Sequence, residues 1–290
     1  MALAGRPNVG KSTLTNAIVG TKVAIVSDRP QTTRRAVRGV ATGPDWQLVL
    51  IDLPGVQRPR DALTARMARR VTLELADADA VLMLLNGEEG VGPGDRFIAA
   101  SLAQAPGPVT LAVNKVDRLS RERQAQALLA AAEIAPPAAE VFPISARSGA
   151  GVGALVSHLV AQLPASPFLY ASAQRSDMAR EDLLAELIRE QVLRRTFQEL
   201  PHAVGVVIEE FEADELDSEL TRIDALIWVE TESQKAIVVG RAGRMVKAIG
   251  TAARRELERE LGGRVHLSLI VRVRRHWRAD DGLLDRLGIE

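Results

Sequence analysis

The sequence predicts an α/β protein in which a domain built on a mostly parallel sheet precedes a smaller α+β domain. The 290 residues are enough for two domains of about 150 residues each. Apolar runs of strand length alternate with helical stretches over the first half of the chain, which indicates a sheet with helices on both faces. A glycine-rich stretch near the amino terminus lies just before a helical segment, which is typical of a phosphate-binding loop.

The elements of the first half follow in a regular order. The expected strands are 1–4, 47–52, 80–85, 109–113 and 141–144, and the expected helices are 13–19, 61–75, 95–105, 121–134 and 152–163. The runs 80–85 and 109–113 are apolar throughout, as expected of strands that are buried on both faces. The first strand is short.

A segment rich in Pro, Ser and Ala, residues 163–175, interrupts this alternation and predicts a linker. We therefore place the first domain at 1–165, the linker at 166–176 and the second domain at 177–290. In the second domain the expected helices are 181–200 and 243–261, and the expected strands are 204–208, 226–229 and 265–273, with a solvated hairpin at 209–219. Residues 235–239 have the propensity of a strand, which is a weak signal by itself.

The composition excludes several classes of site. The chain has no cysteine, which excludes disulfides, zinc–thiolate sites and cysteine nucleophiles and fits a reducing cytoplasm. The four histidines are scattered, which argues against a His-rich metal site. No apolar run approaches the ~18 residues of a membrane helix, and no signal peptide is visible.

The formal charge of zero hides two regions of opposite sign. Residues 176–234 hold 5 basic and 16 acidic side chains, a net charge of −11, whereas residues 235–278 hold 12 basic and 3 acidic ones, a net charge of +9. The basic region predicts either a surface for nucleic-acid phosphates or a solvated, arginine-rich helix face.

The glycine-rich stretch, Gly-Arg-Pro-Asn-Val-Gly-Lys-Ser at 5–12, matches the P-loop pattern G-x-x-x-x-G-K-[ST] in full. Backbone N–H groups and a helix N-terminus cradle phosphates in such a loop. We expect Lys11 to reach the β- and γ-phosphates and Ser12 to bind Mg²⁺. The predicted nucleotide contacts of this region are Asn8, Val9, Gly10, Lys11, Ser12 and Thr13.

Two further segments predict the rest of a phosphate and metal site. The motif D-x-x-G, Asp-Leu-Pro-Gly here, ends a predicted strand, where Asp52 can hold Mg²⁺ through water and the Gly55 N–H can sense the γ-phosphate. The loop 27–35 lies where a switch loop supplies a threonine hydroxyl to Mg²⁺. Thr33 is the first choice for this hydroxyl and Thr32 the second.

The motif N-K-x-D, Asn-Lys-Val-Asp at 114–117, follows a buried run and predicts a guanine site. Asp117 can accept hydrogen bonds from the guanine N1–H and N2–H, a donor pair that adenine lacks. The other predicted base contacts are Asn114, Lys115, Ser145, Ala146 and Arg147. In this order and spacing the four motifs predict a GTPase, with Lys11, Thr33 and Gly55 acting at the reacting phosphate.

Three further stretches are Pro-Gln-Thr-Thr-Arg at 30–34, Glu-Leu-Pro-His-Ala-Val at 199–204 and Gln-Lys-Ala-Ile-Val-Val-Gly at 234–240. Together with the motifs above, they make the chain similar to the Era family of bacterial ribosome-assembly GTPases over essentially its whole length. A single P-loop excludes related GTPases that have two tandem GTPase domains. The resemblance implies a P-loop GTPase domain followed by an α+β type II K homology (KH) domain, in which 235–239 is helical.

In a KH domain, Gly-Arg-Ala-Gly at 240–243 would be the G-x-x-G loop, which clamps four backbone nucleotides of single-stranded RNA. The RNA contacts that the resemblance implies are Lys235, Gly240, Arg241, Ala242, Gly243, Arg244 and Lys247. Four apolar residues would either wall a groove for bases or pack in the core; they are Ile237, Val238, Val246 and Ile249.

The resemblance implies a GTP-driven switch that binds the 3′ end of small-subunit (16S) rRNA and assists assembly of the 30S subunit. GTP or GDP and Mg²⁺ are the implied cofactors. A monomer is expected in the cytoplasm, with peripheral association at the inner face of the membrane. The alternatives are a non-switching RNA-binding scaffold with a structural nucleotide site, and a membrane-surface GTPase.

Two residues bear on the rate of hydrolysis. Val56 follows the D-x-x-G motif, and its apolar side chain cannot orient the attacking water, so we expect slow intrinsic turnover until another element completes the site. Asn8 has two interpretations: it helps to bind K⁺, as a P-loop asparagine does in related GTPases, or it caps the loop.

Overall fold

The computed structural model describes residues 1–29, 31–56, 59–197, 200–213 and 220–289. Their contacts divide the chain into two compact units. Unit 1 comprises Met1–Ala24, Thr33–Pro59 and Met67–Asp177, and unit 2 comprises Ile25–Thr32, Arg60–Arg66 and Met178–Glu290. Two short segments from the first half of the sequence thus group with the second half. The boundaries of the expected linker, 166–176, stay a prediction.

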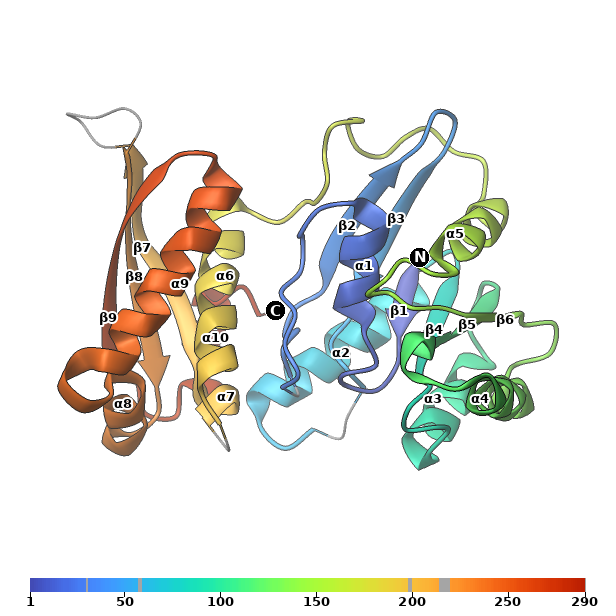
Figure 1. Ribbon diagram of the computed structural model, residues 1–290, viewed down its shortest axis with the longest axis horizontal. Coiled ribbons are helices and arrows are strands. Elements are labelled where there is room, and N and C mark those ends of the chain that lie inside the picture. Colours follow the sequence, from blue (N-terminus) through green and yellow to red (C-terminus); the bar gives the residue numbers. More distant parts are fainter. Residues whose placement is uncertain (30, 57–58, 198–199, 214–219, 290) are drawn as a thin grey trace. The chain divides into compact units, whose positions relative to one another are not determined.

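Unit 1 is built on a six-stranded sheet in the order β2-β3-β1-β4-β5-β6 (Figure 1). The strands are β1 (Ala2–Ala4), β2 (Val37–Thr42), β3 (Gln47–Asp52), β4 (Val81–Asn86), β5 (Val109–Asn114) and β6 (Val141–Pro143). Only the β2–β3 pair is antiparallel among these neighbours. The sequence pattern does not predict β2, because Arg38 and Gly39 interrupt its short apolar run.

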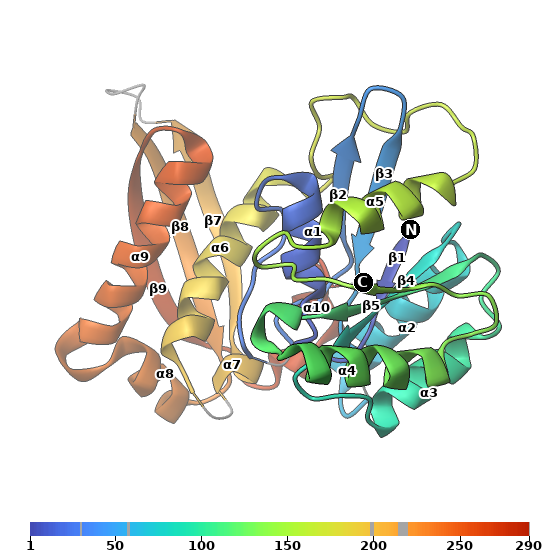
Figure 2. The same cartoon turned by 45° about the vertical axis from the view of Figure 1, so that its right-hand side comes forward.

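Helices cover both faces of this sheet, as the strand–helix alternation predicts. α1 (Lys11–Val19) and α5 (Val152–Ala161) pack on one face. The other face is covered by α3 (Pro93–Leu102), α4 (Arg121–Ile134) and the unit 1 part of α2 (Ala62–Ala76), and Figure 2 shows α3 and α4 beside each other. The predicted elements of this half are confirmed, with ends that differ by a few residues.

The chain after α5 is bound to the edge of the unit 1 sheet. The side-chain oxygen of Gln47 accepts hydrogen bonds from the backbone N–H groups of Leu169 and Tyr170, both at 2.9 Å. Farther along, the Val40 N–H of β2 donates to the carbonyl of Arg175 at 2.8 Å. This segment therefore follows the free edge of β2 instead of crossing open solvent.

Unit 2 has a three-stranded sheet in the order β7-β8-β9, formed by β7 (Gly205–Ala213), β8 (Leu220–Val229) and β9 (Arg264–Val273). β8 is antiparallel to β7 and parallel to β9. Its helices are α6 (Arg180–Arg195), α7 (Leu200–Ala203), α8 (Glu232–Val239), α9 (Arg244–Leu261) and α10 (Asp281–Arg286). Apolar side chains of α6, α8 and α9 form the core against one face of this sheet.

The structure confirms that residues 235–239 are helical, within α8. A capping box between Thr231 and Gln234 starts this helix, and Val238 is buried against the sheet, so tertiary packing overrides the strand propensity. The predicted helix 181–200 is too long, because α6 ends at Arg195. Parts of the stretches 30–34 and 199–204 and of the expected hairpin lie outside the described residues.

No helix in the described ranges of the chain is both long enough and apolar enough to cross a membrane.

Candidate functional site

The P-loop joins β1 to α1 through backbone conformations that favour glycine. Gly5 and Gly10 have φ angles of 148° and 102°. A Cβ at Gly10 would lie 2.2 Å from Asn114 Nδ2, and a Cβ at Gly5 would lie 2.6 Å from the Leu84 carbonyl oxygen. Both positions therefore require glycine. The loop leads into the N-terminus of α1, which has no side-chain cap at Gly10. The first N–H groups of a helix have no partner within the helix and suit an anion.

Lys11, the first residue of α1, points its ammonium group back into this loop. Its Nζ donates to the carbonyl oxygens of Gly5 and Arg6, both at 3.1 Å. Burial lowers the pKa of Lys11 to about 8, and the charge of Asp52 opposes that shift. A bound phosphate would favour the charged ammonium and raise this pKa again.

Three oxygen-bearing side chains from separate segments meet at the start of α1. Ser12 Oγ donates to Asp52 Oδ2 at 2.5 Å and lies 3.0 Å from Thr33 Oγ1, which lies 3.3 Å from the same carboxylate oxygen. Asp52 Oδ1 is buried and has no hydrogen-bond partner within the described part of the chain. Burial raises the pKa of Asp52, against the charge of Lys11 and the two hydroxyl hydrogen bonds. This oxygen set fits Mg²⁺, and a metal-bound water would satisfy Oδ1.

The structure separates the two threonines of the expected switch loop. Thr33 lies with Ser12 and Asp52. The Thr32 hydroxyl instead donates to the Arg29 carbonyl at 2.6 Å and is 2.7 Å from Ser27 Oγ. Thr33 is therefore the threonine that joins Ser12 and Asp52 at the predicted Mg²⁺ site.

Gly55 packs directly against the P-loop. A Cβ at Gly55 would come within 2.7 Å of the backbone nitrogen and the ring of Pro7. The next N–H, that of Val56, donates to the Gly5 carbonyl at 3.4 Å. The D-x-x-G loop thus lies beside the loop that would hold phosphates, and any larger residue at 55 would push the two apart.

Asn114 joins three of the predicted segments through its side chain. Its Nδ2 donates to the Val9 carbonyl of the P-loop at 2.8 Å. Its Oδ1 accepts from the N–H groups of Lys115 at 2.8 Å and Ala146 at 2.9 Å. The Asn114 side chain therefore connects the P-loop to the two loops predicted to contact the base, a role that the sequence motif does not reveal.

The other base-side residues lie on the loops that Asn114 connects. Lys115 has a left-handed φ of 67°, and Asp117 lies in the short 3-10 turn that follows. Ser145 is buried, with Oγ accepting from the Ser148 N–H at 3.2 Å, whereas Arg147 is exposed. Asp117 is exposed as well, so its carboxylate is accessible to a base.

The G-x-x-G sequence forms the connection between α8 and α9 in unit 2. Gly240 has a φ of 71°, and a Cβ there would lie 2.6 Å from Met245 Cβ. Gly243 has a φ of 74°, and a Cβ there would meet no atom within 4 Å. Ala242 adopts a left-handed φ of 51° although it has a side chain. The conformation of this loop therefore depends mainly on neighbouring residues in the sequence. α9 begins directly after it, so the first N–H groups of that helix lie at the loop.

Most of the basic side chains expected near RNA lie on the surface of this region. Arg241, Arg244 and Lys247 are exposed, and Lys235 is half-buried. The apolar residues divide in two: Ile237 is 54% exposed and Val246 is half-buried, whereas Val238 and Ile249 are fully buried. Val238 and Ile249 thus belong to the core cluster and cannot wall a groove.

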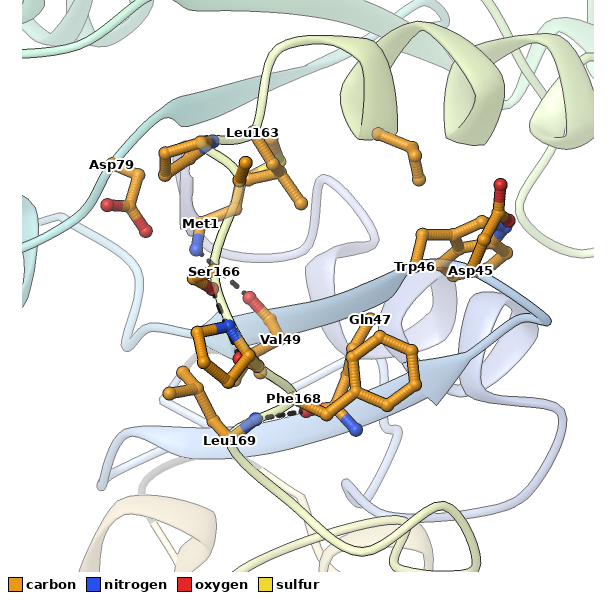
Figure 3. A pocket seen from close by; sticks show the side chains of 14 residues that line it. Met1, Asp45, Trp46, Gln47, Val49, Asp79, Leu163, Ser166, Phe168 and Leu169 are labelled. Atoms are coloured by element: carbon orange, nitrogen blue, oxygen red, sulfur yellow. Dashed lines mark hydrogen bonds between the residues drawn. The ribbon is translucent and has the colours of Figure 1, made fainter.

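A pocket of about 270 Å³ opens in unit 1, between the β2–β3 hairpin and the segment after α5 (Figure 3). Trp46, Gln47, Asp79 and Phe168 line it. It lies where β3 begins, whereas the P-loop follows the carboxyl end of β1 and Asp52 is the last residue of β3, a parallel neighbour of β1. Ligands in such sheets bind at the carboxyl ends, so this pocket is separate from the predicted nucleotide site.

The fold and the P-loop site define a P-loop GTPase joined to a KH domain, and family comparison agrees. Residues 1–115 match the family described as 50S ribosome-binding GTPase, and residues 199–278 match the KH domain family.

The chain belongs to the Era family of GTPases. It is 43% identical over 290 residues to GTPase Era of Mycobacterium avium (strain 104), covering 99% of this chain and 97% of that protein. The crystal structure of Era in complex with MgGDPNP and nucleotides 1506-1542 of 16S ribosomal RNA is similar, with a TM-score of 0.95 and 33% identity over 99% of this chain and 97% of that chain. A crystal structure of an Aquifex aeolicus Era variant bound to GDP.AlF4- has a TM-score of 0.94, with the same identity and coverage.

Proposed function

We propose that this protein is a GTP-hydrolysing switch that binds the 3′ end of small-subunit (16S) rRNA and assists assembly of the 30S subunit. The observation that carries the proposal is the presence, in one chain, of a metal-side oxygen cluster at a P-loop and an exposed basic G-x-x-G loop. The similarity to an Era chain solved with MgGDPNP and 16S rRNA nucleotides supports it.

In the nucleotide site, the backbone of residues 8–13 would hold the phosphates, and Lys11 would move its ammonium to the β- and γ-phosphates. Ser12, Thr33 and Asp52 would hold Mg²⁺, which supplies charge stabilisation at the transferred phosphate. The Gly55 N–H would contact the γ-phosphate. Asp117 would select guanine, with Asn114, Lys115 and the loop 145–147 shaping the base site.

Water attacks the γ-phosphate in line, and positioning and charge stabilisation account for most of the acceleration. Val56 offers no hydrogen bond to that water, so RNA or ribosomal engagement would complete the site. We also propose that Asn8, which has a left-handed φ of 63°, contributes to a K⁺ site beside the phosphates. Turnover compared in potassium and sodium salts tests the K⁺ part.

In the RNA site, the backbone of residues 240–243 would approach the phosphodiester chain, with Arg241, Arg244 and Lys247 supplying charge and Lys235 lying beside the loop. The half-exposed Ile237 would contact bases.

The proposal also includes a monomer that works in the cytoplasm and associates peripherally with the inner face of the membrane. Exposed Arg272, Arg274 and Arg275, at the end of β9, carry charge that anionic headgroups attract. Co-sedimentation with anionic vesicles, with and without an RNA competitor, tests the membrane part. Sedimentation velocity tests the monomer.

The decisive experiment measures affinity for a 16S rRNA 3′-end oligonucleotide with GDPNP and with GDP over a salt series. A switch requires different RNA affinities in the two nucleotide states. The variant Arg241→Asp/Ala242→Asp keeps both loop glycines and places two carboxylates at the phosphates. RNA affinity should fall by about a hundredfold or more and its salt dependence should flatten, while RNA-free GTP turnover stays unchanged.

Equal RNA affinity in the two nucleotide states would support the non-switching scaffold instead. Unchanged RNA affinity of the double variant would move the RNA site away from the G-x-x-G loop, to the arginine-rich end of β9.

A further inference from the structure

We infer that Arg189 and Glu190 of α6 are positioning residues for GTP hydrolysis, because they hold the segment 25–32 that leads directly into Thr33. The inference deepens the proposed switch and rests on it: it states which side chains of unit 2 restrain the switch loop. It depends on contacts inside unit 2, to which both α6 and residues 25–32 belong.

Two hydrogen bonds fix the described part of this segment near its two ends. At the first end, the backbone N–H of Val26 donates to Glu190 Oε1 at 3.0 Å. At the second end, Arg189 Nη2 donates to the carbonyl oxygen of Thr32. Neighbouring residues of one helix thus bind backbone groups at opposite ends of the segment.

Apolar and aromatic contacts add to this attachment. The Ile25 side chain is buried within the core cluster of unit 2, which includes Leu184 and Ile188 of α6. The Arg29 guanidinium lies 4.7 Å from the ring centroid of Phe197, just after α6. The segment therefore packs as a part of unit 2 rather than as a loose loop of the P-loop unit.

α6 buries two charged side chains at positions where apolar residues would be enough to form the core. Arg189 is 2% exposed and Glu190 is fully buried. Glu186 balances the arginine through contacts of 2.8 Å to Nε and 2.7 Å to Nη2, and Arg194 lies 3.1 Å from Glu190. Buried charges are costly unless they are paired and hydrogen-bonded. In this cluster the buried charges also bind the backbone at Val26 and Thr32, so we infer that the cluster serves to position this segment.

The hydrogen bond from Arg189 acts on the residue directly before Thr33, which belongs to the predicted Mg²⁺ site. Thr32 is held by its carbonyl, and the next residue, Thr33, places its hydroxyl 3.0 Å from Ser12 Oγ and 3.3 Å from Asp52 Oδ2. Switch loops are ordered by contacts to Mg²⁺ and the γ-phosphate and are released after hydrolysis. Loss of the α6 restraint should therefore weaken GTP binding and turnover while it spares GDP.

The test uses Arg189→Met in the full-length protein without RNA, so that a failure of the RNA proposal is separate from a failure of this one. Arg259→Met of α9 is the matched control: both arginines pair at 2.7 Å with a glutamate three residues earlier, but Arg259 is 71% exposed and Arg189 is 2% exposed. We expect Arg189→Met to weaken GDPNP affinity and lower kcat by about fivefold or more. GDP affinity should change less than about twofold, and the control should match wild type.

A double-mutant cycle with Thr33→Ala separates positioning from general stability. If Arg189 acts through Thr33, Arg189→Met in the Thr33→Ala background should cause no further loss of GDPNP affinity. Additive losses, or equal losses for GDP and GDPNP, would overturn the inference. Arg189→Lys, which keeps the charge but loses the planar fork, keeps the test open if Arg189→Met does not fold. It should retain GDP affinity and show a smaller, Thr33-dependent loss, and wild-type behaviour of GDPNP with Arg189→Lys would also contradict the inference.

Discussion

The predicted nucleotide site and the G-x-x-G loop would both bind phosphate, but the protein builds them in opposite ways. Lys11 is 6% exposed and Asp52 is fully buried, and Asp52 meets the hydroxyls of Ser12 and Thr33, which lie 40 and 19 residues away along the chain. Arg241 and Arg244 are exposed on one local turn between two helices. The predicted nucleotide site depends on tertiary packing. The G-x-x-G loop depends on the conformation of a short turn and on the charge of its exposed arginines. Substitutions should therefore alter geometry in the first and mainly electrostatics in the second.

The largest expected effect is on hydrolysis in Lys11→Ala. This change removes the one ammonium of the P-loop that can reach the γ-phosphate, and we expect turnover to fall by about a hundred- to a thousandfold. Single-turnover GTP hydrolysis measures the loss, and thermal unfolding checks the fold. RNA affinity in the GDP state should remain at the wild-type level. A fall in RNA affinity in the GDP state would show that the two sites are not independent.

The two glycine-dependent loops can be compared by one substitution. Gly10→Ala and Gly243→Ala both place a side chain at positive φ, 102° and 74°. Such strain costs about 1–3 kcal/mol in stability at either position. Only at Gly10 would the new Cβ also meet Asn114 Nδ2, at 2.2 Å. We therefore expect loss of nucleotide binding in Gly10→Ala, measured by fluorescent-nucleotide titration. Gly243→Ala should keep nucleotide affinity, and equal loss in both variants would refute the contrast.

The same contrast explains how far the sequence alone predicts the molecule. The P-loop, D-x-x-G and N-K-x-D motifs predict where the nucleotide site lies, because each motif has a fixed spacing and directly follows or ends a strand of the sheet. The order of strands and helices in unit 1 follows from hydrophobic patterning. The helical state of residues 235–239 comes from resemblance to a family, since Ile237, Val238 and Val239 favour a strand by propensity.

Tertiary contacts account for what the sequence does not reveal. The apolar stripe of α6 predicts a helix with one buried face, yet Arg189 and Glu190 are buried as well, and they bind backbone groups of Thr32 and Val26. The sequence does not predict the hydrogen bond from Asn114 to Val9 either, because the two residues are 105 positions apart. No local pattern encodes which distant backbone group a polar side chain will meet.

Asp117→Asn should exchange the preferred base. The carboxylate accepts from two guanine donors, whereas the amide presents one donor to xanthine, which has an oxygen in place of the amino group. A hydrogen bond to a charged group contributes about 1.5–3 kcal/mol, so GTP affinity should fall by about ten- to a hundredfold. Competition between GTP and XTP measures the change. An unchanged preference for GTP would remove Asp117 from the base site, and RNA affinity of the nucleotide-free protein serves as the control.

A smaller effect should follow from the pKa of Lys11, which burial lowers from 10.5 to about 8 in the nucleotide-free protein. Bound phosphate favours the charged form, so binding takes up a proton above about pH 8 and GTP affinity should fall as the pH rises, by at most about tenfold per pH unit. The stability of the nucleotide-free protein should instead rise with pH between pH 8 and 10.5. In that range the unfolded chain still holds the Lys11 proton that the folded protein has lost. Calorimetry in buffers of different ionisation enthalpy detects the uptake, and its absence would contradict the buried position of Lys11. RNA binding in the GDP state should show no such step.

The smallest expected effect is in Val56→Ala. Val56 follows the D-x-x-G motif, is half-buried, and packs its side chain against apolar residues of unit 1. Its N–H, which donates to Gly5 at 3.4 Å, remains in the variant. Because no side-chain hydrogen bond is lost, RNA-free turnover should change by less than about threefold, the scale of a substitution that disturbs neither a hydrogen bond nor a charge. Turnover at saturating GTP, beside thermal unfolding, makes the measurement. A collapse of turnover in a folded variant would mean that the apolar side chain itself shapes the path of the attacking water, and the nucleotide site would then depend on packing even at its solvent edge.

Val56→Gln provides the complementary experiment: if an absent water-orienting group limits the rate, a glutamine there should accelerate RNA-free turnover and reduce any stimulation by RNA.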